Sequence, residues 1–93
     1  MILNGKTLEH YKIWFDKYHN DYWTYYQSKP TILNAFYIDF FDIAGIYITS
    51  DYFELNKGFY SEVLNSDFEI IKPTRQETLT EAIKKANEIY NSK

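Results

Sequence analysis

The chain has 93 residues, a net charge of −3 and no cysteine, which predicts one domain, residues 1–93, without disulfides or thiolate chemistry. Aromatic residues make up 20% of it, enough large side chains to build a core in so small a domain. No apolar run reaches the roughly 18 residues of a membrane span, and the N-terminus lacks the apolar segment of a secretion signal, so we expect a cytoplasmic protein.

The first predicted element is an amphipathic helix over residues 7–27. At 3.6 residues per turn, its large apolar side chains all fall on one side of the helical wheel. They are Leu8, Tyr11, Trp14, Phe15, Tyr18, Tyr22, Tyr25 and Tyr26. Thr7 is the candidate N-cap, Ser28, Lys29 and Pro30 end the helix, and Asn20 leaves open a division into two pieces.

The next predicted element is a helix over residues 31–44, with a strand as the alternative. Most of the large apolar side chains of this stretch share one half of a helical wheel. Gly45 follows where a left-handed residue would close a helix. The stretch is also rich in aromatic residues, which favour strands. We expect the helix, and the strand stays open.

From Gly45 onward the sequence predicts a three-stranded antiparallel sheet, because apolar residues begin to alternate with polar ones. The expected first strand begins at Ile46, and a loop covers residues 51–57. The second strand covers residues 58–64, a turn covers 65–67, and the third strand covers 68–72.

The last predicted element is a C-terminal helix after Pro73. Thr74 and Glu77 have the spacing of a capping box. An apolar stripe follows, made of Leu79, Ala82, Ile83, Ala86, Ile89 and Tyr90. Glu81–Lys85 and Lys84–Glu88 are pairs of opposite charge four residues apart. We therefore expect an α+β fold: two N-terminal helices, a three-stranded antiparallel sheet, and a C-terminal helix packed on the sheet.

A single buried cluster is expected to hold these elements together. Its members are the large apolar residues on the faces of the helices and strands that should meet. They are Trp14, Phe15, Tyr18, Phe40, Ile46, Ile48, Phe68, Ile70, Leu79 and Ile83.

Two stretches resemble small uncharacterised proteins encoded by phages and prophages. They are the run DFFDIAGIYI at residues 39–48 and the segment from Thr74 to Asn91, whose Ala-rich helix after a strand is similar to the phage ABA-sandwich group. The resemblance covers about a third of the chain and brings no catalytic residues with it. It implies a small accessory protein acting in the host cytoplasm, a class that includes inhibitors of bacterial defence such as anti-CRISPR proteins.

The residues that could carry chemistry do not form a catalytic or metal-binding pattern. His10 and His19 point in opposite directions on the first predicted helix, so they cannot share a ligand. Asp39 and Asp42 could form a carboxylate pair, but no third ligand lies near them in the sequence. We therefore expect a protein that is not an enzyme and that holds neither a metal nor a cofactor.

The charge distribution favours a binding function. Residues 31–67 contain six acidic residues and one lysine, a net charge of −5, and there is no basic stripe for nucleic acid. Aromatic residues lie next to acidic ones in the predicted loop, a composition typical of protein interfaces. The candidate partner-binding residues are Asp51, Tyr52, Phe53, Glu54, Asp39 and Asp42, which we expect at one end of the sheet.

These residues predict that the protein binds a host protein, which could be a defence effector complex, and that it binds neither nucleic acid nor membranes. The alternative is a small-molecule or nucleotide-binding protein that sequesters a signalling ligand in an aromatic pocket. A component of the virion or of replication is a third possibility. The flat aromatic face of the first helix is also compatible with a homodimer.

Overall fold

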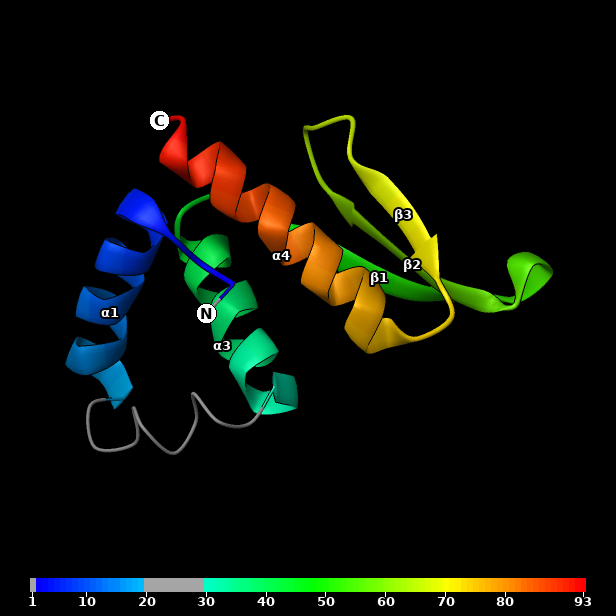
Figure 1. The fold of residues 1–93 in the computed structure, drawn as a ribbon, viewed down its shortest axis with the longest axis horizontal. Helices are drawn as coiled ribbons and strands as arrows, with labels where there is room; N and C mark the ends of the chain where they lie inside the picture. Colours follow the sequence, from blue (N-terminus) through cyan, green and yellow to red (C-terminus); the bar gives the residue numbers. More distant parts are fainter. Residues whose placement is uncertain (1, 20–29) are drawn as a thin grey trace.

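The computed structural model describes residues 2–19 and 30–93 and has the α+β fold that the sequence predicts (Figure 1). Within these residues, two helices precede an antiparallel sheet, and a long helix closes the chain. In chain order the elements are α1 (Gly5–His19), α3 (Pro30–Ile43), β1 (Ile48–Phe53), the 3-10 turn η2 (Glu54–Asn56), β2 (Gly58–Val63), β3 (Glu69–Lys72) and α4 (Arg75–Asn91). None of the described helices is long and apolar enough to cross a bilayer.

The sheet has strand order β1-β2-β3, and α4 packs along one of its faces, contacting all three strands (Figure 1). Ile48 pairs with Val63, and both side chains lie on the α4 side, where Val63 is fully buried. Because side chains alternate along a strand, every second residue points away from α4. We call that second side of the sheet the outer face.

Helix α1 begins earlier than predicted, at Gly5, so the assignment of Thr7 as its N-cap is wrong. Asn91 of α4 takes that role, because its side-chain oxygen accepts a hydrogen bond from the Thr7 backbone N–H at 2.9 Å. The Thr7 hydroxyl instead donates to the Asn87 carbonyl at 3.1 Å. The predicted continuation over residues 20–27 lies outside the described residues.

The helix predicted over residues 31–44 is confirmed as α3, and the strand alternative is wrong. Gly45 has a φ of +81°, the left-handed conformation expected of a residue that closes a helix. The Ile46 N–H donates to the Phe41 carbonyl at 2.8 Å, and the Gly45 N–H donates to Asp42 at 3.1 Å. These are the two hydrogen bonds of a Schellman motif, which stop the helix and turn the chain toward the sheet.

The predicted strand boundaries need correction around β1. The strand begins at Ile48, two residues later than predicted, and it continues to Phe53 through residues assigned to a loop. Asp51, Tyr52 and Phe53 pair with the three residues of β2 that follow the hairpin turn. The reversal itself needs only residues 54–57, and Lys57 adopts a left-handed φ of 48° there.

The N-terminus of α4 is confirmed where the capping box predicts it. The Thr74 hydroxyl oxygen accepts a hydrogen bond from the Glu77 backbone N–H at 3.2 Å. The ion pairs on this helix differ from the prediction, because each lysine meets a glutamate three residues away. Lys84 lies 3.5 Å from Glu81. Lys85 lies 3.7 Å from Glu88.

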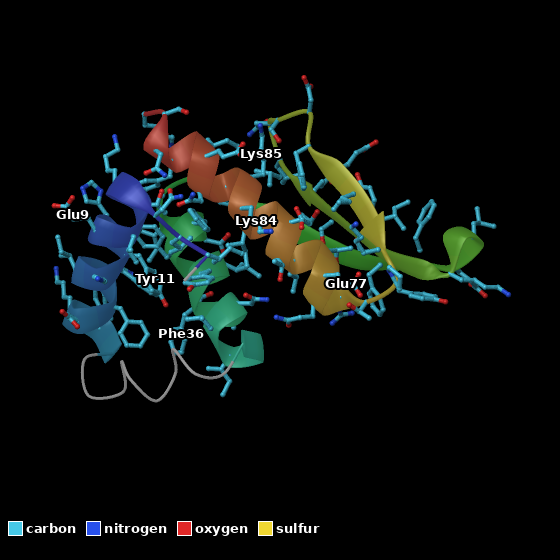
Figure 2. All side chains as sticks on the ribbon, viewed as in Figure 1. Glu9, Tyr11, Phe36, Glu77, Lys84 and Lys85 are labelled. Atoms are coloured by element: carbon cyan, nitrogen blue, oxygen red, sulfur yellow. The ribbon has the colours of Figure 1, made fainter. Side chains whose placement is uncertain are left out.

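The core lies where α1, α3 and α4 meet the start of the sheet. Tyr11 of α1 is fully buried and lies between α1 and α3 (Figure 2). Its ring centroid is 5.0 Å from that of Tyr37 and 5.5 Å from that of Phe40. Phe36 of α3 in turn packs on Phe15 of α1 at 5.1 Å. These contacts between aromatic rings join α1 to α3. Among the described residues, the buried apolar set is Leu3, Tyr11, Phe15, Tyr37, Phe40, Phe41, Ile46, Val63, Ala82, Ile83 and Ala86.

The predicted core is confirmed in part. Four of its ten members are buried: Phe15, Phe40, Ile46 and Ile83. Trp14, Ile48 and Phe68 pack against the cluster while half-buried. Tyr18 was assigned wrongly, since 59% of it is exposed. Ile70 and Leu79 are half-buried and belong neither to the cluster nor to the residues packed against it. A helical wheel gives the side of the helix a residue lies on, but not how far the neighbouring elements cover that side.

Candidate functional site

The six predicted partner-binding residues do not gather in one place. Asp51, Tyr52, Phe53 and Glu54 lie at the far end of β1, where the β1–β2 hairpin projects beyond α4 (Figure 1). Asp39 and Asp42 lie on α3, beside α1, at the opposite side of the molecule. The expectation that the two aspartates of α3 join this end of the sheet is therefore wrong.

The adjacent rings of Tyr52 and Phe53 also point to opposite faces of the sheet, because both residues belong to a strand rather than a loop. Tyr52 packs on Phe59 with ring centroids 5.3 Å apart, on the side where Arg75 of α4 lies over the Phe59 ring. Phe53 lies on the outer face, 6.3 Å from the ring of Tyr60. A single partner surface can therefore contact Phe53 or Tyr52, but not both.

The outer face carries the largest concentration of exposed apolar side chains on the described sheet. Tyr47 is 46% exposed, Phe53 43%, and Leu64 and Ile71 41% each. The strand register places these residues on the side away from α4, with Asp51, Glu62 and Glu69 among them. Tyr60 lies on this face too. None of these positions carries a positive charge.

Two carboxylates of the outer face oppose each other directly. Glu62 of β2 and Glu69 of β3 are cross-strand partners, a like-charge pair that costs stability. The Tyr60 hydroxyl lies 3.0 Å from a carboxylate oxygen of each and donates its proton to the pair. Desolvation, and then the hydrogen bonds to both glutamates, raise the pKa of Tyr60 to about 12. The protonated hydroxyl of Tyr60 thus bridges the two opposed carboxylates at neutral pH.

Sequence reasoning did not assign Glu62, Leu64, Glu69 and Ile71 to a binding surface. Glu62 belongs to β2, Leu64 directly follows it, and Glu69 and Ile71 belong to β3. Their common orientation follows only from the register between β2 and β3. Once the strands are known, a signal exists in the sequence. Glu62 and Leu64 alternate with buried Ser61 and Val63, so one face of β2 is buried and the other is exposed.

Asp39 and Asp42 line a groove of about 490 Å³ between α1 and α3. Its other described lining residues are Trp14, Tyr18 and Ile43. The rings of Trp14 and Tyr18 lie 6.2 Å apart, and Ile43 is 72% exposed. The groove therefore combines apolar surface with two carboxylates.

Desolvation, and then the nearby charge of Asp39, raise the pKa of Asp42 above its ordinary value of 3.8. The folded protein thus binds this proton more tightly than the unfolded chain does. Stability falls as the pH rises from 3.8 through the raised folded-state pKa, and the loss persists at pH 7. The position of Asp42 in the last turn of α3 adds to the cost, because the negative end of the helix dipole lies there.

We therefore expect Asp42→Asn to stabilise the protein at pH 7, within the roughly 0.5 kcal/mol typical of surface changes. Below about pH 3, where the aspartate is itself neutral, the variant and the wild type should melt at the same temperature. Thermal denaturation at both pH values measures this difference. A variant that melts lower than the wild type at pH 7 would show that the carboxylate stabilises the fold.

The histidine whose side chain is described, His10, has a structural partner. Its Nδ1 lies 2.7 Å from the hydroxyl of Tyr90, and the two rings meet edge to face. This contact joins α1 to α4. Within residues 2–19 and 30–93, no three histidine or carboxylate side chains lie close enough together to hold a metal ion.

Comparison with known proteins found no matching family, no matching curated protein and no matching solved structure. The surfaces described above are therefore the basis for assigning a function.

Proposed function

We propose that the protein acts by binding another protein through the outer face of its sheet. The observation that carries this proposal is the combination on that face of four large exposed apolar residues with three carboxylates and no cation. Single exposed apolar residues are ordinary on a protein surface, whereas several gathered on one face together with charges are typical of an interaction site.

The apolar residues would form the centre of the contact. Phe53 and Ile71 lie on the two edge strands, and Tyr60 of the middle strand lies between them. Aromatic residues are enriched in interface hot spots because they exclude water from a large area with few rotatable bonds. A partner seated across the three strands would cover these side chains together.

The charges favour a basic partner surface. Asp51, Glu62 and Glu69 would attract lysine or arginine side chains and speed association at low salt. A cation placed near the opposed Glu62–Glu69 pair would also relieve their mutual repulsion. The same charges disfavour nucleic acid, whose phosphates they repel.

The resemblance to phage and prophage proteins suggests where such a partner is found. We propose a host protein of bacterial origin, such as a component of a defence complex, and an inhibitory effect that comes from occupying its basic surface. This mode of action needs no catalytic residue, since occupancy alone would block the partner.

The test is capture of host proteins with a Phe53→Ser, Ile71→Ser double variant. We expect the variant to lose the protein that the wild type captures, because the desolvated centre of the contact is gone. Removing such hot-spot residues typically costs at least about 2 kcal/mol of binding energy each, or roughly thirtyfold. Both side chains are partly exposed, so the variant should remain folded, as circular dichroism would verify.

The matched control is Ile13→Ser on α1, which also removes an exposed apolar side chain, here 63% exposed and far from the outer face. It should capture the same protein as the wild type. If the control loses the partner and the double variant retains it, the interface lies on α1 and the proposal is wrong. Added salt should weaken capture by the wild type if the three carboxylates contribute.

A further inference from the structure

The groove between α1 and α3 is a second surface whose chemistry is distinct from that of the outer face. We propose that it binds an alkylammonium group, that is, a positively charged amine on an apolar stem. The argument rests on the residues that line the groove and on the end of the helix that borders it, and it is independent of the function proposed for the sheet.

The electrostatic environment of the groove is negative from two sources. Asp39 and Asp42 stand three residues apart on α3, a spacing that places their side chains on neighbouring turns of one helix face. Helix α3 ends at Ile43 with no basic residue in its last turn, so the negative end of its dipole lies beside Asp42. The Lys93 ammonium, which donates to the Ala44 carbonyl at 3.3 Å, offsets part of this charge. Carboxylates at this end of a helix do not stabilise it, and a bound cation would neutralise them.

The walls of the groove suit an apolar stem and a cation together. Trp14 and Tyr18 present aromatic rings, which attract cations to their faces, and Ile43 supplies aliphatic surface. The chain itself shows this attraction, since the Lys17 ammonium lies 5.3 Å from the centroid of the Tyr18 ring. Desolvation and the charge of Asp39 raise the pKa of Asp42, which means that they destabilise its charged form. A positive charge bound nearby would stabilise that form.

Other ligand classes fit this lining less well. Anions would be repelled by the two carboxylates, and a neutral apolar ligand would remove them from water without a counter-charge. Divalent calcium takes six to eight oxygen ligands, and the described lining offers the carboxylates of two residues. An alkylammonium group satisfies the charge and the apolar walls at once. Such a group occurs on lysine side chains and on free polyamines.

The test is an NMR titration of the isotope-labelled protein with n-butylammonium, and with n-butanol as a neutral probe of the same stem. We expect the ammonium to shift the Trp14 indole N–H signal and the backbone amides of residues 39–43, with an affinity in roughly the millimolar range for so open a site. The alcohol should shift them far less. Equal shifts from the two probes would overturn the proposal, because the charge would then play no part.

Substitutions test whether Asp39 and Asp42 supply the charge that attracts the ammonium. Asp39→Asn and Asp42→Asn should each weaken ammonium binding by about two- to fivefold, the range of exposed ion pairs. Asp16→Asn is the matched control, since it removes the same charge from α1 at a position outside the groove lining and should leave binding unchanged. A purely structural role is distinguished by stability, because Asp42→Asn is expected to bind less and melt no lower. Unchanged binding in both groove variants would contradict the assignment.

Two further probes distinguish the sources of the amine. A blocked Gly-Lys-Gly peptide represents a lysine of a partner protein, and spermidine represents a free polyamine. Tighter binding of the peptide assigns the groove to protein recognition, and tighter binding of spermidine assigns it to a metabolite. Failure of both to shift the groove signals would overturn the proposal and would leave the function of the outer face untouched.

Discussion

Truncation of Phe41 to alanine is expected to cost about 3–5 kcal/mol of unfolding free energy, a large share of the 5–15 kcal/mol typical of a whole domain. The side chain is fully buried, and its ring lies 5.4 Å from that of Phe40 and 6.4 Å from that of Tyr90. Loss of the ring leaves a cavity where α3 meets α4. Urea denaturation measures this loss. The slope of the unfolding free energy against urea concentration should stay the same as in the wild type.

The control for this change is Ile43→Ala, two residues along the same helix. Ile43 is 72% exposed, so its truncation should change stability by no more than about 0.5 kcal/mol. Both substitutions place alanine in α3, and their difference isolates burial from helix propensity. A Phe41→Ala variant that loses less than about 1 kcal/mol would show that the core between α3 and α4 is not packed as described.

The second large effect is expected from removal of the asparagine pair that ties the N-terminus to α4. Asn87 Oδ1 accepts a hydrogen bond from the Asn4 backbone N–H at 3.1 Å, and Asn87 Nδ2 donates to Asn4 Oδ1 at 3.0 Å. Asn91, one turn later, accepts from the Thr7 N–H at 2.9 Å and donates to Asn4 Oδ1 at 2.9 Å. These four bonds tie Asn4 and the first turn of α1 to side chains from the other end of the chain.

The double variant Asn87→Ala, Asn91→Ala should therefore lose about 2–6 kcal/mol, at roughly 0.5–1.5 kcal/mol for each of the four hydrogen bonds. Hydrogen exchange should show fast amides in the first turn of α1 well before the rest of the protein opens. The variant Glu88→Ala, Ser92→Ala, which changes the residue after each asparagine, is the control and should lose far less. Equal losses in the two variants would mean that the asparagines act through helix propensity and not through α1.

Local sequence patterns are sufficient to predict α3, α4 and the order of the strands. Each of these elements is defined by residues close in the chain: the apolar stripe of α4, the Thr74–Glu77 cap, and Gly45 at the end of α3. The hydrogen bonds from Asn87 and Asn91 to the N-terminus have no such local signal. Its partners are separated by more than 80 residues, and only the folded structure brings them together.

The end of β1 shows why the candidate site could be predicted only in part. Ser50 and Ser61, opposite each other on the side of α4, are small and polar, so the alternation that marks a strand disappears from the sequence there. Residues 51–53 then resemble a polar loop, although each pairs with a residue of β2. The aromatic and acidic composition of the interface could be read from the sequence. Its division between two faces could not.

The most direct test of the proposed binding surface uses two neighbouring residues that the strand sends in opposite directions. A photo-crosslinking benzoylphenylalanine replaces Phe53 in one variant and Tyr52 in another, and each is irradiated in host lysate. Because Phe53 lies on the outer face and Tyr52 on the side of α4, we predict a strong crosslink to the partner from position 53 and little from position 52. Crosslinking from position 52 with none from position 53 would contradict a partner seated on the outer face.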